Sequence, residues 1–159
     1  MPNEMVLKPV GIVHAGDTGF AVEIYPEYRP ALKELGGFSH IHVLWWGGQA
    51  DNNECRKTLT CIPPYAKEHE TGVFATRSPM RPNPILMTVC PVIDVDMESG
   101  MIAVPYLDAF DGTPVVDIKA YFPLSDRVRH AAYPEWLSHW PEWMPEEEGE
   151  VDFAALGLA

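Results

Sequence analysis

The sequence predicts a mainly β protein, a small antiparallel β-barrel with short helices, a C-terminal aromatic helical segment and an acidic tail. Sixteen prolines and twelve glycines interrupt the chain often, which favours short strands over long helices. Strand-like apolar runs follow one another at short spacing, as in antiparallel barrels and sandwiches. A hydrophobic fraction of 47% in 159 residues is sufficient for one core.

Local patterns predict the elements of the first half. β-Branched residues before a Gly-Asp turn predict a strand over roughly 5–14, and strict alternation predicts a half-buried strand over 19–26. The segment "RPALKELGG" has a proline in its first turn and glycines at its end, which indicates a short helix. Two further strands are expected in "FSHIHVLWWGG" and in "TLTCIPP".

Three more strand-like runs follow in the second half, "ILMTVCPVIDVD", "MIAVPYLDA" and "PVVDIKAYF". Neither repeats nor a linker are visible, so residues 1–145 are predicted to form one domain. Its aromatic C-terminal segment is expected to form short helical turns that pack on the barrel. Residues 146–159 are predicted to be an acidic, loosely held tail.

Several classes of protein are disfavoured by composition. No apolar run approaches the about 18 residues of a membrane span, and the N-terminus lacks the pattern of a signal peptide. Cys55, Cys61 and Cys90 are an odd set without CxxC spacing, which predicts reduced thiols in a cytoplasmic protein. A net charge of −12 argues against extensive contact with a polyanion, although it does not exclude nucleic acid.

Two histidines are the only pattern that suggests a metal. His40 and His42 lie two apart on a predicted strand, so their rings share one face. No third ligand follows at a suggestive spacing, and we predict no metal site. The favoured interpretation is one packed and one hydrogen-bonded histidine.

The segment 77–84, "RSPMRPNP", is the strongest candidate for a binding site. Its prolines fix the backbone and reduce the entropy lost on binding. Arg77 and Arg81 can each bind a carboxylate or phosphate, or stack over a flat ring. Asn83 offers a donor and an acceptor for the edge of a heterocycle. The competing interpretation is that both arginines pair with carboxylates of this acidic protein.

A second constellation lies in "YLDAFDGTPVVDIKAYFP". Asp108 precedes a tight Asp-Gly-Thr-Pro turn that Asp111 opens, and Asp117 and Lys119 share one face of the next strand. Each pattern taken alone also fits an ordinary turn and an ordinary surface ion pair.

Taken together, "GFSHIHVLWW", "GVFATRSPMRPNPI" and "LDAFDGTPVVDIKAYFP" resemble the TsaA-like family, which includes the TrmO tRNA methyltransferases. The resemblance runs from about Gly11 to Pro123. It implies a small β-barrel that binds S-adenosylmethionine, typically as a homodimer with the cofactor near the interface. It also implies methyl transfer to N6 of the adenosine beside the anticodon.

The resemblance also implies site residues. The positions expected to bind the cofactor are Gly48, Gln49, Arg77, Met87, Pro105, Tyr106, Leu107 and Asp108. Asp108 and Asp111 are the catalytic candidates, because an exocyclic amine must lose a proton when it is methylated. Arg81 and Asn83 are the candidates for binding the substrate.

The sequence departs from the family at three points. "VHAGDTGFAVEIYPEY" lacks the family's Pro-Arg-Gln-Pro-Gly-like run, Leu86 replaces a glycine, and the chain ends soon after the barrel. The last point and the acidic charge weaken tRNA as a partner more than they weaken S-adenosylmethionine. The alternatives are a methyltransferase acting on a small molecule and a binding module without catalysis. Five tryptophans offer surface for a homodimer.

Overall fold

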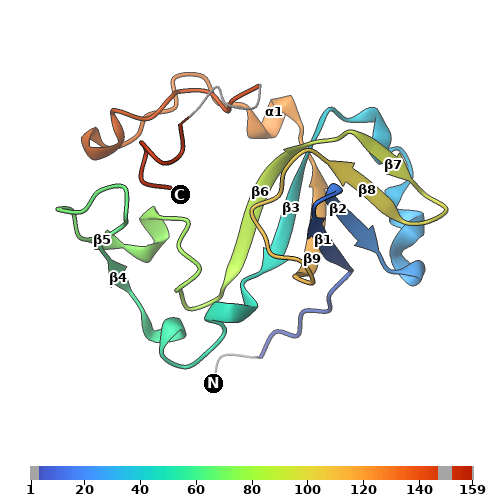
Figure 1. Ribbon diagram of the computed structural model, residues 1–159, viewed down its shortest axis with the longest axis horizontal. Helices are drawn as coiled ribbons and strands as arrows, with labels where there is room; N and C mark the ends of the chain where they lie inside the picture. The colour runs from blue at the N-terminus through green and yellow to red at the C-terminus, as the bar shows by residue number, and fades with distance from the viewer. Residues whose placement is uncertain (1–3, 147–151, 159) are drawn as a thin grey trace.

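The protein is built on a seven-stranded antiparallel sheet. The computed structural model describes residues 4–146 and 152–158 (Figure 1). Its strand order is β6-β3-β9-β1-β2-β8-β7, and a separate two-stranded sheet pairs β4 with β5. The strands are β1 (Gly11–Gly16), β2 (Gly19–Ile24), β3 (His40–Trp46), β4 (Thr60–Cys61), β5 (Thr71–Gly72), β6 (Ile85–Pro91), β7 (Asp94–Asp96), β8 (Met101–Val104) and β9 (Pro114–Ala120).

The helices are all short. The one α-helix of the described residues is α1 (Pro123–Asp126). The 3-10 turns are η1 (Pro26–Leu32), η2 (Leu35–Gly37), η3 (Gly48–Ala50), η4 (Cys55–Lys57), η5 (Val73–Ala75) and η6 (Glu135–Leu137). The short helix expected in "RPALKELGG" is replaced by η1 and η2, because Pro30 lies inside η1 and Glu34 adopts a left-handed conformation between the two turns. No helix in the described residues is long and apolar enough to cross a membrane.

Alternating side chains place the core on one face of the sheet. In β3, Ile41, Val43 and Trp45 are buried, whereas their neighbours are only half-buried. These residues join a single cluster with side chains from β1, β2, β6, β8 and β9. Strands are therefore confirmed in these regions, and burial of the cluster stabilises the sheet. The strand expected over roughly 5–14 begins only at Gly11, because Pro9 has no N–H to donate to a ladder.

The predicted barrel is not closed. Among the described residues β6 and β7 are the two edges of the sheet, and they do not pair with each other. The single run expected over 85–96 divides at Val92 and Ile93. The amide of Val92 donates to Ser39 O beside β3, and the next amide donates to Ala103 O of β8. The chain thus crosses from one edge to the other within two residues, so the sheet curls strongly while its ladder stays open.

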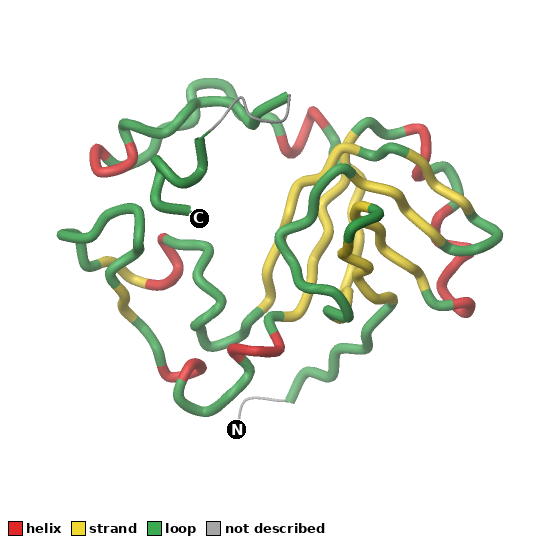
Figure 2. Tube along the Cα trace, viewed as in Figure 1, coloured by secondary structure: helices red, strands yellow, loops and turns green. Residues whose placement is uncertain are grey.

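Residues 48–84 leave the sheet between β3 and β6 and form a satellite lobe (Figure 1). Figure 2 shows that this lobe is mostly loop. The strand expected in "TLTCIPP" is reduced to the two residues of β4, because Pro63 and Pro64 cannot donate to a ladder.

The C-terminal strap, residues 127–146, runs from α1 to the satellite lobe (Figure 1). Trp136 stacks on His69 at 4.9 Å between ring centroids, and Tyr65 contacts both Trp136 and Trp140. The ring contacts of this segment are with the 63–69 loop, and its expected packing on the sheet stays a prediction. Of the predicted acidic tail, residues 147–151 and 159 lie outside the described residues. Residues 152–158 form a turn in which Gly157 lies closely against Pro64 and Tyr65.

Candidate functional site

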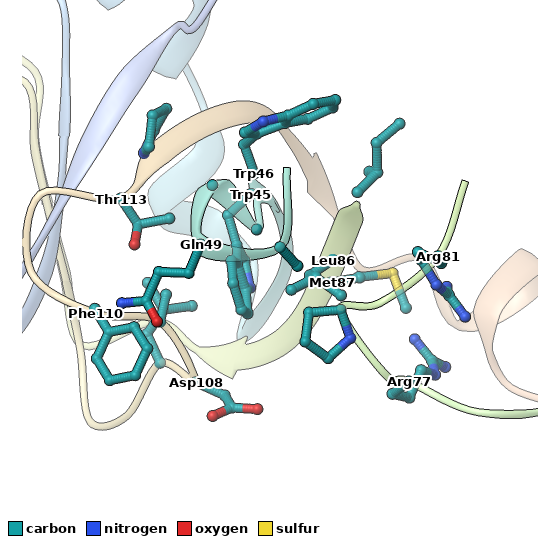
Figure 3. A pocket seen from close by; sticks show the side chains of 18 of the residues that line it. Trp45, Trp46, Gln49, Arg77, Arg81, Leu86, Met87, Asp108, Phe110 and Thr113 are labelled. Carbon is teal, nitrogen blue, oxygen red and sulfur yellow. The ribbon is translucent and has the colours of Figure 1, made fainter. Parts of the chain in front are cut away.

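A cavity of about 920 Å³ opens where the sheet meets the satellite lobe. Its floor consists of the ends of β3 and β6, with Trp45, Leu86 and Met87. The turn at 47–50 forms one side together with residues 106–114, which comprise most of the 105–113 loop and the first residue of β9. The Arg/Pro loop, residues 77–84, contributes Arg77, Pro79, Met80 and Arg81 to the other side (Figure 3).

Most of the predicted site residues line this cavity, although they come from separate segments. The lining members are Gly48, Gln49, Arg77, Arg81, Met87, Tyr106, Leu107, Asp108 and Asp111. Two predicted residues are outside the lining. Pro105 directly precedes the first residue of the 106–114 lining. Asn83 lies within the Arg/Pro loop but is exposed, and its carbonyl accepts the amide of Ile85 at 2.7 Å.

Arg81 is bound by the backbone of its own loop. Its Nη2 donates to the carbonyls of Val73 at 2.6 Å and Thr76 at 2.8 Å. The hydroxyl of Thr76 also donates to Val73 O and accepts the amide of Ser78. These bonds join the Arg81 guanidinium to carbonyls at the two ends of the turn η5, so Arg81 stabilises the loop conformation.

Arg77 differs from Arg81 in its surroundings. Its side chain is exposed, and within residues 4–146 and 152–158 it forms neither an ion pair nor a hydrogen bond. Arg81 also makes no ion pair in this part of the chain. The alternative that both arginines serve as partners of the protein's carboxylates is therefore not supported there. Arg77 is a cation available to a ligand.

Arg56 joins two walls of the cavity. Its Nε donates to Asp51 Oδ1 at 2.6 Å, and its Nη1 donates to Pro82 O at 2.9 Å. Its guanidinium also lies 5.6 Å from the ring centre of Trp46, within the range of a cation–π contact. The hydrogen bond from Arg56, followed by one from Trp46 Nε1, lowers the pKa of Asp51. The turn after β3 is thereby fixed to the Arg/Pro loop.

The 105–113 loop is fixed to the sheet at both ends. Cys90 Sγ donates to Tyr106 O at 3.3 Å, and Leu107 is buried in the core. At the other end, Asp111 Oδ1 accepts the amide of Ala15 at 3.0 Å, and Gly112 donates to Val13 O. Gly112 has a φ of 76°, a conformation that glycine adopts without steric cost.

The two candidate carboxylates therefore have different partners. Asp111 is bound to a backbone amide. Asp108 is exposed, and within the described residues it accepts one hydrogen bond, from the Tyr106 hydroxyl at 3.3 Å. Burial raises the pKa of Tyr106, and the adjacent Asp108 raises it further, so the phenol stays protonated and able to donate. Asp108 keeps lone pairs for a ligand.

Several lining residues carry little functional signal in the sequence, among them Trp45, Trp46, Leu86, Phe110 and Thr113. Their signal was weak, because aromatic and aliphatic residues at strand ends usually pack in the core. Trp45 does so, and its Nε1 donates to Thr88 Oγ1 at 3.1 Å.

The histidine pair lies away from this cavity. His42 stacks on Tyr121, with 5.5 Å between ring centroids, and its Nε2 lies 3.4 Å from Asp126 Oδ2. His40 is paired with the Ser39 hydroxyl. The interpretation as packed and hydrogen-bonded histidines is confirmed in its main features. In the described part of the chain, no three histidine, cysteine or acidic residues are grouped as metal ligands.

The fold and cavity define a class, the small antiparallel β proteins with a cavity beside a curled, open sheet. Residues 8–127 match the family described as tRNA-methyltransferase O N-terminal domain, and the chain belongs to this family.

Named relatives and a solved structure are similar over most of the chain. An S-adenosyl-L-methionine-binding protein of Archaeoglobus fulgidus is 38% identical over 78% of this chain and 94% of its own length. The tRNA (adenine(37)-N6)-methyltransferase of Escherichia coli is 35% identical over 79% of this chain, which spans 52% of that protein. The crystal structure of TrmO from Pseudomonas aeruginosa gives a TM-score of 0.65 and 25% identity, covering 85% of this chain and 62% of that one.

Proposed function

We propose that this protein is an S-adenosylmethionine-dependent methyltransferase whose acceptor is adenine N6 of a tRNA anticodon-loop nucleotide. One observation carries the proposal. Residues expected to bind the cofactor, taken from four separate segments, line a single cavity that contains an unpaired arginine. The relatives named for binding S-adenosyl-L-methionine support the choice of cofactor.

The cavity suits a nucleoside-sized ligand. A volume of about 920 Å³ lies in the upper part of the range for small-molecule sites, roughly 300–1,000 Å³. Arg77 would bind the methionine carboxylate, because a guanidinium matches a carboxylate in a bidentate geometry. Met87, an exposed side chain of the floor, would contact the adenine ring, and Gln49 would bind polar groups of the ribose or the base.

When bound, S-adenosylmethionine supplies a methyl group already activated on a sulfonium, so the chain has mainly to position the acceptor. The amine lone pair forms the new N–C bond as the S–C bond breaks, and the amine then loses a proton. Asp108 would accept this proton, because its carboxylate is exposed and free of backbone bonds. Asp111 would instead position the loop through its bond to Ala15.

A direct test is calorimetric titration of the protein with S-adenosylmethionine. We expect micromolar affinity in the wild type and a loss of about tenfold or more in Arg77→Ala, because hydrogen bonds to charged groups contribute about 1.5–3 kcal/mol. Arg127→Ala is the matched control, since Arg127 is exposed outside the cavity. No binding by the wild type would refute the cofactor and would favour a diverged protein without this activity.

The acceptor is tested separately. Transfer of labelled methyl to unfractionated tRNA, followed by digestion to nucleosides, should yield N6-methyladenosine. Labelling of adenosine or AMP with unlabelled tRNA would favour the small-molecule alternative. Cofactor binding without transfer to any acceptor would favour a binding module.

We also propose a homodimer. The satellite lobe exposes several large apolar side chains, with Phe74 83% exposed, Leu59 66% and Ile62 59%, and such exposure is common at interfaces. Among the five tryptophans, Trp143 has a strongly exposed side chain, with 68% of its surface accessible. Sedimentation at micromolar concentration should give a dimer, and a 17.8 kDa monomer would refute it.

A further inference from the structure

Phe110 is an exposed aromatic residue that lines the cavity. It lies at the tip of the 105–113 loop and is 69% exposed. In Figure 3 its ring lies near Gln49, Asp108 and Thr113, across the floor from Arg77 and Arg81. A single exposed phenylalanine is not unusual, so its significance depends on how it is held.

The loop holds Phe110 in a fixed position. The amide of Thr113 donates to Phe110 O at 3.2 Å, and the amide of Ala109 donates to Leu107 O at 2.8 Å. The next residue, Asp111, is bound to Ala15 of β1. Backbone bonds on both sides thus fix the tip, and a ring presented in this way loses little entropy when a ligand packs against it.

The ring of Phe110 also lacks an aromatic partner among the described residues. Its neighbour Tyr106 packs edge-on against Phe20 at 5.5 Å, whereas Phe110 is in no such pair. Polar groups surround it instead, with the Asp108 carboxylate two residues away and the Gln49 amide nearby (Figure 3). A free aromatic face beside donors and acceptors is the arrangement that binds a flat heterocycle.

We infer that Phe110 is a specificity-determining residue that stacks on the acceptor base beside the Asp108 carboxylate. The inference rests on the proposed function, in which the cofactor takes positions 48–49, 77, 87 and 105–107 and Asp108 accepts the proton of the acceptor amine. Phe110 lies outside that set, at the rim where an acceptor enters. Stacking would hold the exocyclic amine near Asp108, which is then placed to receive its proton.

The test compares Phe110→Ala, Phe110→Leu and Phe110→Tyr with the wild type. Stacking on one base contributes enough for a change of about tenfold to a hundredfold on truncation to alanine. We expect Phe110→Ala to raise the KM for tRNA by about this factor, with the Kd for S-adenosylmethionine changed less than about twofold. Phe110→Tyr should keep the wild-type KM for tRNA, whereas Phe110→Leu should raise it as Phe110→Ala does. Phe153→Ala is the control, since Phe153 is an exposed phenylalanine outside the cavity.

A second readout does not require turnover. The protein saturated with S-adenosylhomocysteine is titrated with AMP, and the wild type and Phe110→Tyr should bind it more tightly than Phe110→Ala and Phe110→Leu. This result would support stacking even if tRNA were not the acceptor, in which case only the proposed acceptor fails.

Other outcomes would overturn the inference. An unchanged KM and AMP affinity in Phe110→Ala would show that the ring does not contact the acceptor. Weaker S-adenosylmethionine binding in that variant would assign the ring to the cofactor. Wild-type behaviour of Phe110→Leu would indicate aliphatic packing, and a shift from dimer to monomer in Phe110→Ala would assign the ring to a subunit interface. The inference would also be overturned if the wild type bound S-adenosylmethionine but neither bound AMP nor transferred methyl to any acceptor.

Discussion

The sheet and the satellite lobe are stabilised in different ways. All the residues of the buried hydrophobic cluster lie outside 48–84, and backbone ladders join the strands of the sheet. In the lobe, β4 and β5 have two residues each. Its buried residues, none of which belongs to the sheet cluster, are Ala50, Pro63, Val73, Thr76 and Pro84. The lobe depends instead on arginine side chains that bind backbone carbonyls and on ring contacts with the strap.

Because of this difference, the cavity has a rigid side, formed by the sheet, and a more adaptable side, formed by the satellite lobe. The floor belongs to β3 and β6, whereas the free cation, Arg77, belongs to the lobe. Ligand-contacting segments generally come from the less stable parts of a fold. The lobe therefore has the properties expected of a wall that adjusts to a ligand, and the sheet those of a fixed reference for the 105–113 loop.

The largest effect should come from the sheet. Ile102 is fully buried in the cluster, so Ile102→Ala leaves a cavity and should lower the free energy of unfolding by about 2–5 kcal/mol. Urea denaturation measures this value. Ile62→Ala is the counterpart in the lobe, where the side chain is 59% exposed, and should change it by less than about 0.5 kcal/mol. Equal losses in the two variants would contradict the contrast between the regions.

The next largest effect is expected at the junction between the Asp51 turn and the Arg/Pro loop. Arg56→Ala removes the bonds that join the Asp51 turn to the Arg/Pro loop, and we expect S-adenosylmethionine affinity to fall by about 1 kcal/mol, or roughly fivefold. Arg29→Ala is a matched control, because Arg29 also binds backbone carbonyls, at Glu98 and Ile24, away from the cavity. Similar affinity in Arg56→Ala and the wild type would show that the junction does not position the site.

The strap should have a smaller and local effect. Trp136→Ala removes two ring contacts, with Tyr65 and His69, each of which contributes about 0.5–1.5 kcal/mol in aromatic pairs. We expect faster amide exchange in the 61–70 segment and no change in β1 or β9. Trp143→Ala should leave exchange unaltered, since its side chain is 68% exposed. Faster exchange throughout the sheet would mean that the two regions are coupled.

An effect that appears only at high pH concerns Cys90, in the sheet beneath the loop. Burial raises the pKa of its thiol from 9.0 to about 12. Because the folded pKa is the higher one, the stabilisation is complete below pH 9 and is lost as the pH rises towards 12. The stability difference between the wild type and Cys90→Ala should therefore shrink over this interval, as measured by denaturation. A constant difference would contradict the assigned burial.

Local patterns predicted the strands well where alternation was clear, as in β2, β3 and β9. They failed where proline dominated, since "TLTCIPP" kept two residues of strand and "RPALKELGG" became 3-10 turns. Barrel closure was also beyond local pattern. The run 85–96 looks continuous in sequence, and only its tertiary pairing shows that its two halves lie at opposite edges.

The sequence by itself determined the strand content, the family and the segments that supply the site. Tertiary structure decided the role of each side chain within those segments. Arg77 and Arg81 look equivalent in "RSPMRPNP", yet one binds its own backbone and the other is free. Asp108 and Asp111 diverge in the same way, because Asp111 bonds to Ala15, 96 positions away. A contact over such a separation depends on how the strands are ordered in the sheet, and no local pattern encodes that order.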